Sequence, residues 1–117
     1  MKRVENFPDD ENGDVLRRMQ ESGDDLSKAR NIDFTVVLPT REASERFAAP
    51  FMAAGYQVKI DESGTVPELP WDVIVVKHMV PTHAAITEFE EELERYAAPL
   101  TGRNDGWGCF EQQNDLH

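Results

Sequence analysis

The run WDVIVVKHMV at residues 71–80 constrains the fold more than any other part of the sequence. Apolar residues fill neighbouring positions of this run instead of every second one, so the strand it predicts is expected to be buried on both faces, as a central strand is. Pro81 and Thr82 then stop the strand and cap a predicted helix over residues 83–97. The apolar stripe of that helix consists of Ile86, Phe89, Leu93 and Tyr96. This pairing predicts a helix packed on a sheet.

Further segments complete the pattern on either side of this pair. They are a helix from Asn12 or Asp14 to Ser22-Gly23, a strand at 33–39, a helix at 41–54, a strand at 56–61 and a last strand within 103–112. Pro50 lies inside the second helix, where it removes a backbone donor and collides with the carbonyl group four residues earlier. A kink or break of that helix is therefore expected near residues 46–50.

The predicted order is helix, strand, helix, strand, strand, helix, strand. Two βαβ halves of this kind, each with a right-handed crossover, give an α+β fold, the ferredoxin-like βαββαβ sandwich. Its four-stranded antiparallel sheet carries two helices on one face, and the first and third strands lie centrally. The N-terminal helix precedes this unit. The other face of the sheet stays open unless the N-terminal helix, a loop or another molecule covers it, and a binding function would most simply reside there.

The stretch RNDGWGCFEQ at 103–112 is interpreted as a turn followed by the closing strand. Asn104, Asp105 and Gly106 tolerate positive φ, so they are predicted to form the turn that delivers residues 107–110 into the strand. In that strand Cys109 shares a face with Trp107.

The 117 residues fit one domain, with a flexible lead-in at 1–11, a single domain at 12–112 and a tail at 113–117. The single cysteine, Cys109, excludes an internal disulfide and favours a reducing cytoplasm. No apolar run approaches the roughly 20 residues that a membrane-spanning helix needs, and no secretion signal is expected.

The formal net charge of -11 argues against direct binding of nucleic acid, because phosphate backbones are bound by Lys and Arg. An acidic surface instead attracts a basic protein partner. The alternative is that the charge only keeps the chain dispersed in water.

Candidate catalytic groups are few. Cys109 with His78 or His83 would need a thiol and an imidazole within hydrogen-bond reach, and a half-buried structural cysteine is the favoured interpretation. His78 and His83 without a third ligand at a recognisable spacing do not predict a zinc site. The sequence thus predicts no catalysis, metal or cofactor.

Three stretches together resemble the ribonuclease E inhibitor family, the regulators of ribonuclease activity of type B. They are GDDLSKARNIDF at 23–34, KHMVP at 77–81 and NDGWGCFE at 104–111, of which DGWG is the most specific. The resemblance spans roughly residues 14–111, most of the chain. It implies a ferredoxin-like fold, no enzymatic activity, and binding to the endoribonuclease that initiates messenger RNA decay, whose activity is lowered. It also implies an arginine-rich noncatalytic region in that ribonuclease, which an acidic chain would complement.

The hypothesis is therefore a noncatalytic binding domain that occupies a basic surface of ribonuclease E. The residues expected to contact that surface are Trp107, Asp105, Trp71, Asp24, Asp25, Glu91 and Glu92. The alternative from another class is a small-molecule-sensing ferredoxin-like domain that acts as a dimer through its open sheet face.

Overall fold

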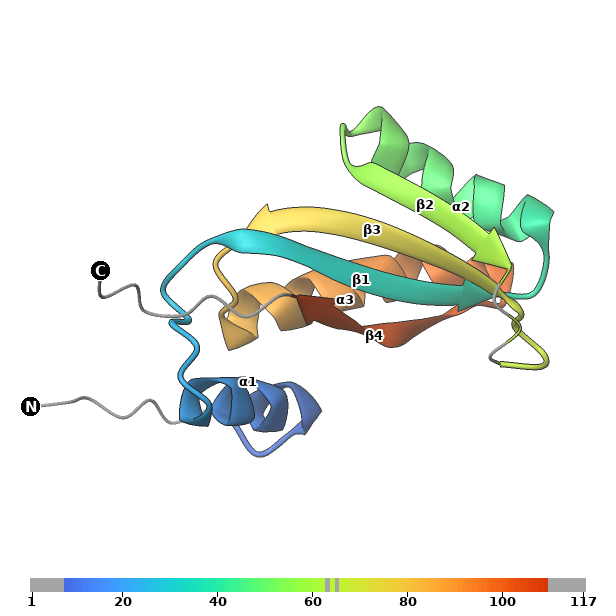
Figure 1. Cartoon of the computed structure of the whole chain (residues 1–117). Helices are drawn as coiled ribbons and strands as arrows, with labels where there is room; N and C mark the ends of the chain where they lie inside the picture. The colour runs from blue at the N-terminus through green and yellow to red at the C-terminus, as the bar shows by residue number, and fades with distance from the viewer. Residues whose placement is uncertain (1–7, 63, 65, 110–117) are drawn as a thin grey trace, which may run out of the picture.

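The computed structural model describes residues 8–62, 64 and 66–109 of the chain. Most of the expected lead-in, the last three residues of the expected domain and the whole expected tail lie outside the described residues. The elements in chain order are α1 (Glu11–Glu21), β1 (Arg30–Leu38), α2 (Arg41–Ala53), β2 (Gln57–Glu62), β3 (Trp71–Met79), α3 (His83–Ala97), the 3-10 turn η1 (Ala98–Leu100) and β4 (Arg103–Cys109) (Figure 1). None of the described helices is both long and apolar enough to cross a membrane.

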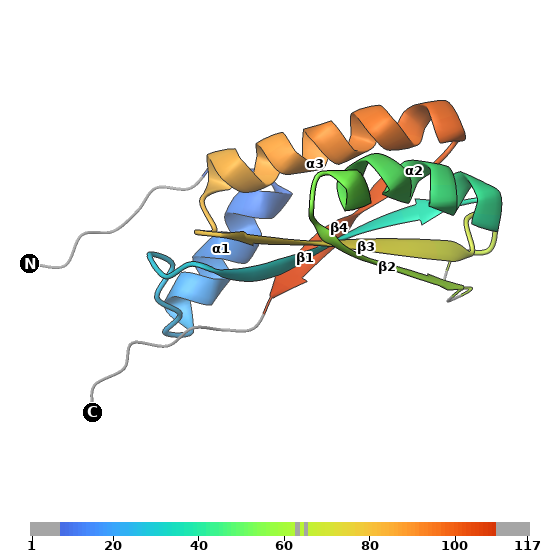
Figure 2. The same ribbon diagram turned by 90° about the horizontal axis from the view of Figure 1, so that it is seen from above.

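The strands form one antiparallel sheet in the order β2-β3-β1-β4. The prediction that the first and third strands lie centrally is therefore confirmed, as is the α+β class. Helices α2 and α3 lie on the same side of the sheet (Figure 2). We call that side the covered face.

The core lies between α2, α3 and the covered face. Six alternate residues of β1 and β3 that point into it are fully buried: Ile32, Phe34, Val36, Leu38, Val73 and Val75. The ring of Phe34 meets Phe89 of α3 edge to face, with centroids 4.7 Å apart. Burial of each such aromatic side chain stabilises the fold by roughly 1.5–3 kcal/mol, so the alternating pattern of β1 determines which face receives the helices.

The opposite side of the sheet, which we call the uncovered face, has no described helix or strand packed on it (Figure 2). On this side Ile74 and Val76 of β3 are only half-buried. The prediction that 71–80 is buried on both faces is therefore wrong, although β3 is a central strand. Its apolar residues on the uncovered face are shielded by neighbouring side chains of β1 and β2 rather than by another layer.

Helix α1 packs at the β4 edge of the sheet and against α3 (Figures 1 and 2). Asp10 caps its start, because an Asp10 carboxylate oxygen accepts a hydrogen bond from the Gly13 N–H at 2.7 Å. Leu16 is fully buried and belongs to the same core cluster as the sheet residues. The N-terminal helix therefore does not fill the uncovered face.

Helix α2 runs continuously through Pro50, so the predicted break does not occur. Pro50 stands only three residues before the end of the helix at Ala53, so its missing N–H removes a single bond from the last turn. Phe47 and Phe51 on either side of it are both buried in the core, which holds that turn in place.

The predicted turn at 104–106 is wrong, because these residues lie inside β4. Phe34 pairs with Trp107 and Val36 with Asn104, so Asp105 and Gly106 together oppose the single residue Thr35 as a β-bulge. Gly106 adopts φ +104° there. The chain reverses earlier, at Thr101 (φ +60°) and Gly102, where an added Cβ would lie 2.7 Å from the Val37 carbonyl oxygen. The tolerance of Asp105-Gly106 for turn-like backbone angles is thus used in a β-bulge and not in a turn.

Candidate functional site

The segment DGWG lies where α1, α3 and β4 meet, beside a recess of about 300 Å³. We call this site the junction recess. Its lining residues are Glu11, Asn12, Val15, Glu90, Asn104, Asp105, Gly106 and Trp107. Three elements that are distant in the sequence contribute to it, so the recess exists only when α1 is docked.

A hydrogen-bond network centred on Asn12 holds the recess together. The Asn12 Nδ2 donates to Glu90 Oε1 at 2.7 Å and to Thr87 Oγ1 at 3.2 Å. The indole Nε1 of Trp107 donates to Asn12 Oδ1 at 2.9 Å. The second oxygen of Glu90 accepts from Asn104 Nδ2 at 2.9 Å. Glu90 therefore links α1 to β4, and the tryptophan is held in a defined orientation.

The open side of the recess combines an aromatic ring with negative charge. Trp107 is half-buried, and the carboxylates of Glu11 and Asp105 are exposed beside it. Neither carboxylate has a basic side chain within ion-pair distance in the described part of the chain. An arginine or lysine side chain of a partner could stack on the ring and pair with these acids.

Sequence reasoning did not predict Asn12, Glu90 or Asn104 as part of this site. A signal was present at Glu90, which is four residues after Ile86 and three before Leu93 and so interrupts the buried stripe of α3. An acid at such a position needs a polar partner. Asn12 gives no comparable signal.

Asp24 does not lie on the surface. It is 5 % exposed, and its carboxylate lies 2.8 Å from the guanidinium of Arg30, which is 4 % exposed. The burial of Arg30 forces this arrangement, since a buried cation needs a partner. Asp24 is thus corrected from an expected contact residue to an internal ion-pair partner.

The other predicted contact residues are spread over the molecule. Asp25 is half-buried next to Asp24, and its carboxylate accepts hydrogen bonds from the Ser27 hydroxyl and N–H, which lower its pKa. Glu91 is exposed and Glu92 half-buried on α3. Trp71 begins β3, where it pairs with Leu38, whereas Trp107 pairs with Phe34. Of the predicted contact residues, Asp105 and Trp107 line the junction recess together, and the buried Asp24 lines a neighbouring pocket with Trp107.

Cys109 lies in an environment that disfavours its thiolate. Burial raises the pKa of its thiol, and the neighbouring Arg30 only partly opposes this effect. His78 hydrogen-bonds Asn31 at 2.9 Å, and His83 bonds the Asp10 carboxylate at 2.9 Å. Among the described residues neither histidine is bonded to Cys109, and no group of three or more potential metal ligands is found.

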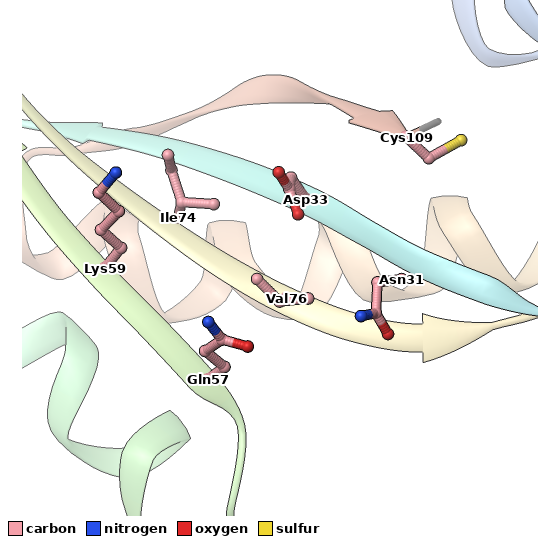
Figure 3. Close-up of a pocket in the computed structure, with 7 residues that line it drawn as sticks. All are labelled: Asn31, Asp33, Gln57, Lys59, Ile74, Val76 and Cys109. Carbon is pink, nitrogen blue, oxygen red and sulfur yellow. The ribbon is translucent and has the colours of Figure 1, made fainter. Parts of the chain in front are cut away.

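A second hollow lies on the uncovered face and holds about 520 Å³. Figure 3 views it with α3 behind the sheet, and its lining residues are Asn31, Asp33, Gln57, Lys59, Ile74, Val76 and Cys109. These come from four different strands. The sequence indicated an open face but not which residues would line it, because their grouping depends on strand register.

Comparison with known protein families indicates the functional class of the protein that carries these two sites. The family described as regulator of ribonuclease activity B matches residues 9–109. The chain belongs to this family. A search of curated proteins found no match. Members of the regulator of ribonuclease activity B family act as regulators of ribonuclease activity, which implies a protein partner, and the family is not known as a catalytic one. The matched range includes α1 and DGWG, and therefore the whole described part of the junction recess.

Proposed function

We propose that this protein is a noncatalytic regulator that binds a basic region of ribonuclease E and lowers its activity in the cytoplasm. The observation that carries the proposal is the family match over residues 9–109. The net charge of -11 supports it, because an acidic surface speeds association with a basic partner and rejects acidic competitors. We also infer a ferredoxin-like arrangement, which the strand order β2-β3-β1-β4 and the two helices on one face support.

In this proposal the junction recess supplies the specific contact. Trp107 provides an aromatic surface that is already ordered by its bond to Asn12, so little side-chain entropy is lost on binding. Asp105 and Glu11 provide the charge. Glu91 and Glu92 extend the acidic surface along α3, and Asp25 contributes through the overall field. Trp71, at the start of β3, would be a separate aromatic contact.

The test is isothermal titration of the chain with the noncatalytic region of ribonuclease E, at low and at high salt. We expect stoichiometric binding that weakens with salt, since exposed charge pairs are screened. The double variant Glu11→Gln, Asp105→Asn should weaken binding about 5- to 30-fold, from two pairs of about 0.5–1 kcal/mol each.

A matched control neutralises two exposed acids of α2, Glu42→Gln with Glu45→Gln, and should leave the affinity within about twofold. Cleavage of an RNA substrate by the ribonuclease, measured with increasing amounts of the chain, reports inhibition. Absence of binding at low salt would refute ribonuclease E as the partner. Equal loss in both double variants would show that charge alone, and not the recess, carries the contact.

A further inference from the structure

The uncovered face presents a groove whose floor is apolar and whose walls are polar. Ile74 and Val76 of β3 form the floor. Asn31 and Asp33 of β1 stand on one side, and Gln57 and Lys59 of β2 stand on the other (Figure 3). Strand register fixes this arrangement, because Val76 pairs with Asp33 and Gln57, and Ile74 pairs with Lys59. The groove is therefore built on the two central strands and the edge strand β2.

The uncovered face also carries a local excess of negative charge. By strand alternation and register it bears Asp33, Asp61 and Asp72 against two basic residues, Lys59 and, at the β4 edge opposite Val37, Arg103. The Nζ of Lys59 lies 3.6 Å from Asp61 Oδ2 and forms an ion pair with it. Asp33 and Asp72 have no basic partner in the part of the chain that the structure describes. A docked molecule that carries positive charge could therefore pair with these two carboxylates.

We propose that the uncovered face is a second docking surface, which binds an extended basic segment of a protein partner. The spacing supports an extended occupant, because Val76, Ile74 and Asp72 follow one another along β3 at every second residue, about 6.6 Å apart. An extended segment repeats its side chains at the same interval, so apolar groups can contact Ile74 and Val76 while a basic group meets Asp72. The side-chain amides of Asn31 and Gln57 can bond its backbone.

Other occupants fit less well. A second copy of the chain would bring like charges together, because each copy carries a net charge of -11. Nucleic acid is repelled by the same carboxylates. The identity of the partner rests on the proposed function, whereas the chemistry of the groove does not.

The experiment uses the full chain and a synthetic peptide of ten residues in which arginine and valine alternate. Methyl and side-chain amide signals are followed by NMR during titration. We expect shifts at the Ile74 and Val76 methyls and at the Asn31 and Gln57 amides. The methyls of Val73 and Val75 serve as an internal control, since they lie on the covered face of the same strand and are fully buried.

Charge-reversal variants give the matching affinity test. Asp33→Lys with Asp72→Lys should weaken peptide binding more than tenfold. Glu45→Lys with Glu88→Lys makes the same change in net charge on the helices of the covered side and should weaken it less than threefold. Unchanged Val73 and Val75 signals show that each variant is folded.

Three results would overturn the docking surface: shifts confined to the Trp107 indole and the Asn12 amide, equal weakening in both double variants, or groove signals that change with protein concentration alone. The last would make the face a contact between copies. The two proposals fail separately. If the peptide occupies the groove but the noncatalytic region of ribonuclease E does not bind, the docking surface stands and the proposed partner is wrong.

Discussion

The two ends of α1 are attached to the rest of the protein by different physics. At its start, Asp10 and Asn12 reach α3 and β4 through hydrogen bonds that are exposed or half-buried. Just after its end, Asp24 and Arg30 form an ion pair that is almost fully buried. Water competes with the first set of contacts and hardly reaches the second, so the same kinds of polar group differ widely in what their loss costs.

At the buried end, the guanidinium of Arg30 is surrounded by hydrogen-bond acceptors. The Arg30 Nη1 bonds Asp24, and its Nη2 donates to the Asp25 carbonyl at 2.8 Å and to the Lys28 carbonyl at 3.2 Å. The hydrogen bond with Asp24 raises the pKa of Arg30, although burial acts in the opposite direction. The loop between α1 and β1 therefore folds around one guanidinium, which fixes where α1 ends relative to the sheet.

The largest expected effect comes from removing this guanidinium. Arg30→Met removes the guanidinium that pairs with the buried Asp24 carboxylate, so the free energy of unfolding should fall by about 3–5 kcal/mol. Urea denaturation measures the change. The exposed pair Arg41–Glu45, whose side chains are 74 % and 57 % accessible, gives the control. Arg41→Met should cost only about 0.3–0.5 kcal/mol.

A second variant separates the charge from the packing. Asp24→Leu combined with Arg30→Met removes both charges and should recover most of the loss, because a buried ion pair often stabilises no more than apolar groups of similar volume. If the double variant were as unstable as Arg30→Met, the hydrogen bonds from Arg30 to the Asp25 and Lys28 carbonyls would be its main contribution to stability. The two ends of α1 would then differ in how backbone carbonyls are bonded and not in the burial of an ion pair.

An intermediate effect is expected at the exposed end, from Trp107→Phe. The substitution keeps most of the apolar ring but removes the indole donor to Asn12, so we expect a loss of about 1 kcal/mol in the free energy of unfolding. Trp71→Phe is the matched control, since Trp71 makes no side-chain hydrogen bond to the described part of the chain. Comparable losses in the two variants would mean that Trp107 acts through packing alone.

The contrast between the ends of α1 also marks what the sequence could predict. Periodicity located α3 and the alternation in β1, because these patterns arise within one element. The ion pair of Asp24 with Arg30 was missed, since Asp24 looks like any acid of a polar loop until the position of β1 shows that it is buried. Arg30 was placed before the first strand, yet it pairs with Met79 inside the sheet.

The candidate site was predicted in part for the same reason. DGWG was identified as the distinctive segment, and the structure places it in a recess. Glu90 left a signal, as an acid within the buried stripe of α3, but its bond to Asn12 depends on how α1 docks, which no local pattern encodes. The grouping of Asp33 with Lys59 and Val76 on the uncovered face likewise follows from register between three strands.

The smallest effect concerns pH at the exposed end. The Gly13 N–H, followed by the hydrogen bond from His83, lowers the pKa of Asp10 below its ordinary value. A carboxylate with a lowered pKa in the folded state stabilises the fold above its ordinary pKa of about 3.9, and that stability is lost as pH falls through the folded pKa. Asp10→Asn keeps a side-chain oxygen for the helix cap but does not titrate. Its unfolding free energy should therefore fall less steeply than that of the unchanged protein below about pH 5.

His83→Gln tests which neighbour of Asp10 matters more. Glutamine retains a donor for Asp10 but carries no charge, and the Gly13 N–H, the larger cause of the lowered pKa, is untouched. We therefore expect His83→Gln to flatten the acid side of the stability curve less than Asp10→Asn does, with urea midpoints measured from pH 2 to pH 6. If His83→Gln flattens it as much, the contact between α1 and α3 controls Asp10 and the helix cap does not. The exposed end would then resemble the buried one, with a single ion pair as its principal attachment.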